Sequence, residues 1–104
     1  MRDIGLSSNI LDDVVKLLAK NKKITSSSLF GSRAKGNFKP HSDVDIAIFG
    51  DCDIFDVENL ILELNDLPAS VKFDVVAYSL VDNPDLLSHI DRVGISIYKE
   101  DINA

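Results

Sequence analysis

The chain has 104 residues, of which 45% are hydrophobic and 27% charged, and its formal net charge is −6 at pH 7. This length fits one small domain, residues 1–104, and the hydrophobic content is typical of a folded globular protein rather than a disordered one. The negative charge argues against direct nucleic-acid binding, which needs a basic footprint. The single cysteine, Cys52, and the lack of any apolar run near the roughly 20 residues that span a bilayer predict a cytoplasmic protein with no membrane segment.

The average charge hides a division along the sequence. Residues 14–42 contain seven basic residues and no acidic one, whereas residues 43–104 contain fourteen acidic residues and three basic ones. Two differently solvated faces would explain this division. A site whose entrance attracts a polyphosphate while its floor binds a metal ion would explain it equally well.

Hydrophobic periodicity predicts the elements in chain order. Apolar residues at helical spacing predict a first helix, capped by Ser8 or Asn9, that runs to about Lys20. Two more helices are predicted over 54–66 and over 84–93. Strands are expected at 24–30, 43–49, 71–77 and 95–98. Asp53 and Asn83 stand where they can cap the second and third helices, and Pro84 suits a first helical position.

A glycine turn follows the first strand. Gly31 permits backbone conformations that other residues resist and lets a ligand approach the main chain closely. Residues 32–35 can form a short helical turn whose backbone N–H groups point outward and can bind an anion. Judged by charge alone, Arg33 and Lys35 are candidates for neutralising phosphate oxygens; the alternative is a solvated basic turn.

Three carboxylates are candidates for metal binding. Asp43 and Asp45 point to the same side of their strand, with Cα atoms about 6.5 to 7 Å apart, so both can reach ions placed between them. Asp74 lies in a later strand between apolar neighbours, Phe73, Val75 and Val76, and could be a third ligand and a general base. Oxygen ligands without a Cys/His cluster favour Mg²⁺ or Mn²⁺, and two ions about 3.5 to 4 Å apart suit the gap. The alternative is that these acids cap a strand or face solvent.

These residues together resemble a known family. Gly31-Ser32, ten intervening residues and Asp43-x-Asp45 match the signature of the DNA polymerase beta-like nucleotidyltransferase superfamily, in which a later strand acid such as Asp74 is the usual third ligand. The fuller pattern Gly-Ser-Arg-Ala-Lys-Gly with Ser-Asp-Val-Asp-Ile resembles the minimal nucleotidyltransferase (MNT) branch, the antitoxin component of HEPN/MNT pairs. The resemblance implies an α/β fold of the α+β type, with a small mixed β-sheet and helices packed on it.

The resemblance also implies a reaction and a partner. Gly31 and Ser32 would hold the triphosphate of ATP, while Asp43, Asp45 and Asp74 would bind Mg²⁺. AMP would pass from ATP to a hydroxyl, a tyrosine of a HEPN toxin, which would make the chain an adenylyltransferase and an antitoxin. A non-catalytic antitoxin that neutralises its partner by occlusion is the alternative, and both homo- and hetero-oligomers remain open. His89 is expected to be a surface or helix-end residue.

Overall fold

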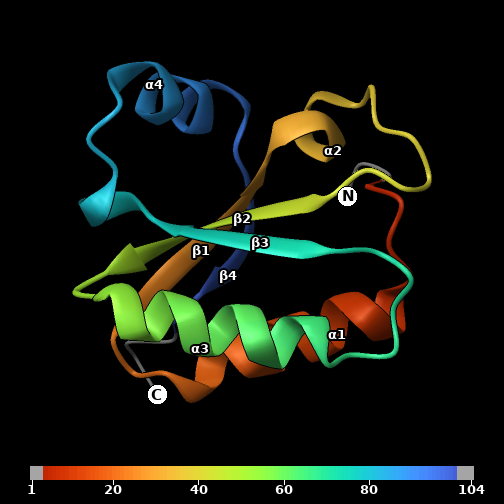
Figure 1. Ribbon diagram of the computed structural model, residues 1–104, viewed down its shortest axis with the longest axis horizontal. Helices are drawn as coiled ribbons and strands as arrows, with labels where there is room; N and C mark the ends of the chain where they lie inside the picture. The colour runs from red at the N-terminus through yellow and green to blue at the C-terminus, as the bar shows by residue number, and fades with distance from the viewer. Residues whose placement is uncertain (1–3, 101–104) are drawn as a thin grey trace.

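The computed structural model describes residues 4–100, over which helices and strands alternate (Figure 1). The elements are α1 (Ser8–Lys20), β1 (Ile24–Phe30), α2 (Gly31–Lys35), β2 (Val44–Gly50), α3 (Ile54–Asn65), β3 (Phe73–Ala77), the 3₁₀ helix η1 (Tyr78–Leu80), α4 (Pro84–Val93) and β4 (Ile95–Lys99). The predicted helices and strands are therefore confirmed in type and order. η1 was not predicted.

The four strands form one mixed sheet in the order β3-β2-β1-β4. β1 runs antiparallel to both of its neighbours, whereas β2 and β3 are parallel. The expected mixed sheet is confirmed. The register matters for the site because Asp45 of β2 lies opposite Phe30 of β1 on one side and Asp74 of β3 on the other.

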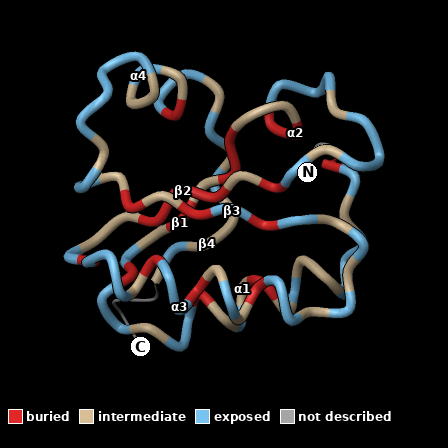
Figure 2. Tube along the Cα trace, in the orientation of Figure 1, coloured by how far each residue is buried: buried red, intermediate tan, exposed pale blue. Residues whose placement is uncertain are grey.

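Helices cover both faces of this sheet: α1 and α3 pack on one face, and α2 and α4 lie on the other (Figure 1). The alternation in β2 explains the division, since successive side chains of a strand point to opposite faces. Val44, Ile46 and Ile48 are buried in the main hydrophobic cluster, which includes residues of α1 and α3. Ala47 points the other way and is buried with Phe30 and Ile90 in a smaller cluster under α4. Figure 2 shows buried residues concentrated along the central strands.

Side-chain caps set the starts of the long helices. Asp53 and Asp56 form a reciprocal capping box at α3, and Asn83 accepts hydrogen bonds from the first turn of α4, as predicted. The cap of α1 is Ser7, whose side chain accepts a hydrogen bond from Ile10 N, so the prediction of Ser8 or Asn9 was one or two residues late.

Two strands begin later than predicted. Asp43 immediately precedes β2 instead of starting it, and β3 begins at Phe73 instead of residue 71. The amide of Asn65 hydrogen-bonds both the N–H and the carbonyl of Phe73, at 2.9 and 3.0 Å. This side chain ties the end of α3 to the first residue of β3.

No helix within residues 4–100 combines the length and apolar character needed to cross a membrane.

Candidate active site

The glycine turn joins β1 directly to α2. Gly31 has a φ of +75°, in the left-handed region that favours glycine. A Cβ at this position would also collide with the carboxylate of Asp45. Conformation and space therefore both require glycine here, and the main chain passes directly beside an acid of the predicted site.

Two of the three predicted acids lie side by side. Asp45 and Asp74 are register partners in the parallel pair of β2 and β3, so their side chains point to the same face of the sheet. For Asp45 this is the face of Ala47, which α2 and α4 cover. The Oδ1 atom of Asp74 accepts a hydrogen bond of 3.0 Å from Val75 N, which orients its carboxylate.

The electrostatics of Asp45 report on all three acids. Partial burial is the main cause that raises the pKa of Asp45 above its ordinary value, and the negative charges of Asp74 and Asp43 raise it further, while His89 lowers it. No lysine or arginine forms an ion pair with these three acids in the part of the chain that the structure describes. The acids therefore share a concentration of negative charge that a cation would relieve.

Asp43, the third predicted acid, is held in place less firmly than Asp45 and Asp74. It is exposed and lies just before β2, outside the ladder that fixes the other two acids. Within residues 4–100, no three His, Cys, Asp or Glu side chains are gathered closely enough to hold a metal ion between them. The donor set, three carboxylates and no sulfur or imidazole, fits the chemistry of Mg²⁺ or Mn²⁺. A metal site built from all three would need the carboxylates to converge further than they do here.

Arg33 does not face the acids, which corrects its prediction as a phosphate ligand. Its side chain is only 1% exposed. Its Nη1 atom donates a hydrogen bond to the carbonyl of Ile4 at 2.8 Å. Nη2 donates to the carbonyls of Ser42 and Pro40, at 2.9 and 3.4 Å. Nε also donates to the carbonyl of Ser42, at 3.2 Å. The guanidinium also lies over the ring of Phe38, 5.0 Å from its centroid. Arg33 therefore anchors the loop that leads to Asp43.

Ser32 and Lys35 remain available for the predicted phosphate contacts. Ser32 is half-buried at the start of α2, and its carbonyl accepts hydrogen bonds from the backbone of Gly36 and Asn37 at 2.9 and 3.2 Å. Lys35 is exposed at the end of α2. Gly36 follows with a φ of 87° and ends the helix in the left-handed conformation.

His89 lies against the glycine turn, a contact that its position in the sequence indicated only weakly. Its Nε2 atom accepts a hydrogen bond of 3.2 Å from the backbone N–H of Gly31, across 58 residues of chain. Its ring also meets Phe30 in an edge contact, with centroids 6.0 Å apart. It was expected at the surface or at a helix end, but it is half-buried in the middle of α4. The one available signal was weak: His89 lies beside Ile90 on α4, between the inward-facing Leu86 and Val93.

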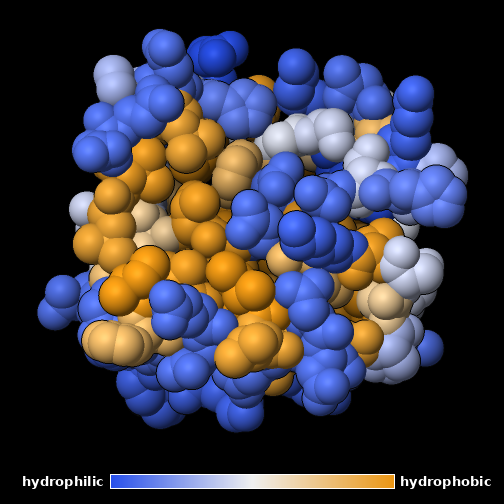
Figure 3. Space-filling view, in the orientation of Figure 1, coloured by the Kyte–Doolittle hydropathy of each residue, from blue (hydrophilic) through white to orange (hydrophobic). Residues whose placement is uncertain are grey.

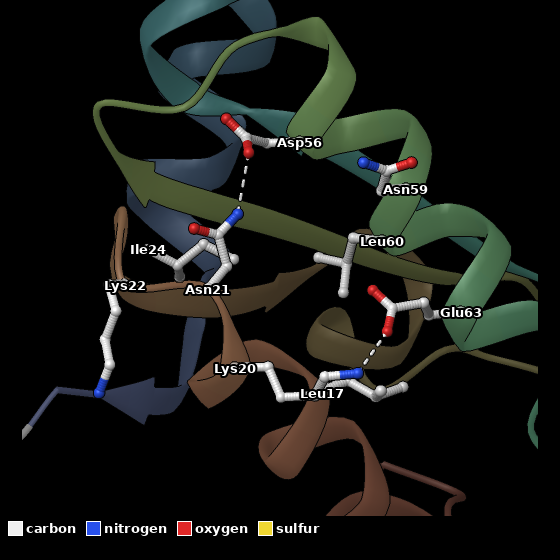
Figure 4. Close-up of a pocket in the computed structure, with 9 residues that line it drawn as sticks. All are labelled: Leu17, Lys20, Asn21, Lys22, Ile24, Asp56, Asn59, Leu60 and Glu63. Carbon is white, nitrogen blue, oxygen red and sulfur yellow. Dashed lines mark hydrogen bonds and ion pairs between the residues drawn. The ribbon is translucent and has the colours of Figure 1, made fainter.

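A separate cavity of about 290 Å³ lies between α1, α3 and the start of β1 (Figure 4). Four of its polar side chains pair with one another: Lys20 binds Glu63 at 2.9 Å, and Asn21 donates to Asp56 at the same distance. Hydrogen bonding from Lys23 holds the pKa of Asp56 well below its ordinary value. This cavity is on the sheet face opposite α2 and α4, so it is not part of the candidate active site.

Similar structures share this fold. A toxin–antitoxin structure with AMP-PNP superimposes with a TM-score of 0.71 at 26% identity, covering 86% of this chain and 73% of that one. A complex of tri-AMPylated Shewanella oneidensis HEPN toxin with MNT antitoxin gives 0.68 at 21% identity, covering 91% and 74%. A MntA–HepT toxin–antitoxin structure gives 0.69 at 21% identity, covering 90% and 74%.

The sequence was also compared with curated proteins and with family models. No curated protein matches it. The family model described as polymerase beta, nucleotidyltransferase matches residues 12–103, a span that includes the glycine turn, all three acids and His89. The chain therefore belongs to the polymerase beta nucleotidyltransferase family.

Proposed function

We propose that this chain, as one domain over residues 1–104, is a cytoplasmic, Mg²⁺-dependent adenylyltransferase that transfers AMP from ATP to a tyrosine hydroxyl of a HEPN toxin and so acts as its antitoxin. The observation that carries the proposal is the placement of Asp45 opposite Asp74 and directly beside the Gly31 turn. The family match supports nucleotidyl transfer. The structure with AMP-PNP, 26% identical, supports an adenine nucleotide, and the AMPylated complex is the precedent for the acceptor.

The turn is assigned to the triphosphate. Gly31 lets the phosphates approach the backbone, the Ser32 hydroxyl donates to a phosphate oxygen, and Lys35 adds a positive charge at the entrance. Arg33 acts indirectly, because its donors hold the loop that carries Asp43. His89 keeps the Gly31 peptide oriented through its hydrogen bond.

The carboxylates are assigned to the cation and the proton. Asp43, Asp45 and Asp74 would hold Mg²⁺, which when bound neutralises phosphate charge and orients the reacting oxygens. The acceptor oxygen attacks the α-phosphorus, the bond from that phosphorus to the bridging oxygen breaks, and pyrophosphate leaves. Asp74 accepts the hydroxyl proton. Such a reaction depends mainly on positioning and charge neutralisation, which this small site can provide.

A non-catalytic antitoxin is the second candidate. One observation favours it: in the described residues, Asp43 is not gathered with the other acids into a ready metal site. Under this alternative the chain silences its partner by covering it, without modifying it.

Labelling of the partner separates these functions. The chain, a HEPN-domain protein encoded beside it, labelled ATP and Mg²⁺ should give a labelled partner. Asp43→Asn and Asp45→Asn should reduce labelling by at least about 100-fold, whereas Asp12→Asn, an exposed acid on α1, should leave it unchanged. Partner silencing that persists in the unlabelled Asp45→Asn mixture would favour occlusion over transfer.

A further inference from the structure

We infer that the groove along the outer edge of β3 is the surface on which the acceptor protein docks, through a segment that presents apolar and basic side chains. This inference rests on the proposed function, because it names the part of the molecule that brings the acceptor to the site. β3 is the outermost strand on its side of the sheet. The groove therefore follows an edge that no other described strand covers.

The groove has a volume of about 200 Å³, and the residues that line it are all apolar. It is formed by α3, β3 and the segment at and after η1, through Ile54, Val57, Val75, Val76, Ala77, Leu80 and Val81. Ile54 and Leu80 stand on its two sides, and each is 53% exposed. Large apolar side chains that remain exposed around a concave apolar surface are typical of a site that a partner covers.

Hydrophobic residues gather on this face of the molecule. Figure 3 shows them as a nearly continuous area, on the same side as the end of β3 and beside a hydrophilic region. Phe55, which follows Ile54 in α3, is also a large apolar residue left exposed, at 68%. This face offers a partner an apolar contact surface larger than the groove alone.

The charge around the groove identifies the kind of occupant. Segments 51–58 and 80–85 contain six acidic residues and no lysine or arginine. Lys23 pairs with two of them, Asp53 and Asp56, which leaves four exposed acids: Asp51, Glu58, Asp82 and Asp85. A second copy of this chain would bring the same acids together and be repelled. A partner with basic residues around an apolar centre is complementary instead.

The groove also lies close to the site. Val76 lines the groove two residues after Asp74 on β3, about 7 Å away at the usual rise per strand residue, and the two side chains point to the same face of the sheet. A protein seated on the groove would therefore extend over the acids without needing a pocket in this chain for its acceptor hydroxyl. This arrangement explains how so small a domain could select a protein as acceptor.

Binding measurements with charged substitutions test the inference. Ile54→Lys and Leu80→Lys each place a cation in the groove, and each should weaken binding of the HEPN-domain protein by at least about tenfold. Leu62→Lys is the matched control, because Leu62 is 71% exposed on α3 but does not line the groove. The affinity of the Leu62→Lys chain for the HEPN-domain protein should stay within about twofold of the wild type. Asp82→Lys should weaken binding and reduce its salt dependence.

Three outcomes would overturn the docking surface. One is unchanged affinity for both Ile54→Lys and Leu80→Lys in chains whose circular dichroism and melting match the wild type. Another is a wild-type chain that binds no HEPN-domain protein although ATP and Mg²⁺ raise its melting temperature, which leaves the nucleotide site standing. The third is a dimer of the chain alone that Leu80→Lys dissociates, which would assign the groove to self-association. Absence of the melting shift itself would contradict the proposed function instead.

Discussion

Asp45 is the residue on which the site depends most. It lies against Gly31, opposite Asp74, and near enough to Asp43 for that charge to matter. Partial burial and two like charges raise its pKa, and among residues 4–100 it has no Lys or Arg ion pair. An ionised carboxylate in this position costs stability unless a cation is bound.

The raised pKa predicts how stability changes with pH. Because the folded state binds the Asp45 proton more tightly than the unfolded state, the free energy of unfolding should fall as pH rises from 3.8 through the raised folded pKa. Asp45→Asn should remove this decrease and be more stable than the wild type at pH 7 without divalent cations. Urea denaturation of both chains between pH 3 and 8 measures these free energies of unfolding. An Asp45→Asn chain that is less stable at pH 7 would show that Asp45 supports the fold.

Single residues of the site could be predicted from sequence only in part. Gly31, Asp45 and Asp74 stand out because a glycine at a strand end and acids in apolar strands are unusual, and the structure brings them together. His89 could not be predicted, because its contact with Gly31 depends on how α4 crosses the sheet. Charge alone also misjudged Arg33, since a charge does not reveal which groups its side chain reaches.

Among the elements, α2 shows how a short helix can place a loop. It has only five residues and ends at Gly36, yet it buries Arg33, whose donors meet three backbone carbonyls on two separate segments. Those bonds tie Ile4 and the loop before β2 to α2. The position of Asp43 thus depends on an arginine ten residues earlier.

Replacing this arginine should destabilise the protein. Arg33→Met keeps much of the apolar stem but leaves the carbonyls of Ile4 and Ser42 without their donors, so we expect a loss of about 2–5 kcal/mol in the free energy of unfolding. Arg33→Lys should recover only part of it, since one ammonium cannot reach all three carbonyls. Denaturant titration checks both. Arg92→Met, at an exposed arginine of α4, should change stability by less than about 0.5 kcal/mol, and an equal effect at both sites would refute the anchoring role.

Most elements could be predicted because their local signals agree with the fold. The alternation in β2 and the caps at Asp53 and Asn83 depend only on residues that are close in sequence. They can therefore be recognised without the tertiary structure. The start of β3 could not be predicted, because it coincides with contacts from the Asn65 side chain. η1 was missed because three residues carry too little periodicity to distinguish a 3₁₀ turn from a loop.

At the scale of the whole molecule, the basic and the acidic residues lie in different places relative to the candidate site and the groove. The basic residues of 14–42 do not gather at the site, since Lys20 and Lys23 bind acids of α3 or its cap, and Arg33 is buried. Of the basic residues that the charge division suggested for a polyphosphate entrance, Lys35 is thus the one that we assign to the site. The acidic half supplies both the carboxylates at the starts of β2 and β3 and the acids around the groove.

The central claim is that the Gly31 turn and the three acids together bind ATP with Mg²⁺, and thermal melting tests it most directly. Ligand at a hundredfold excess over its Kd contributes about 2.7 kcal/mol, which should raise the melting temperature by about 10–20 °C. We predict this rise for the wild type with ATP and Mg²⁺ together, and its loss in Asp45→Asn, each chain compared with its own ligand-free form. No rise at millimolar ATP and Mg²⁺, or an equal rise in Asp45→Asn, would contradict the account.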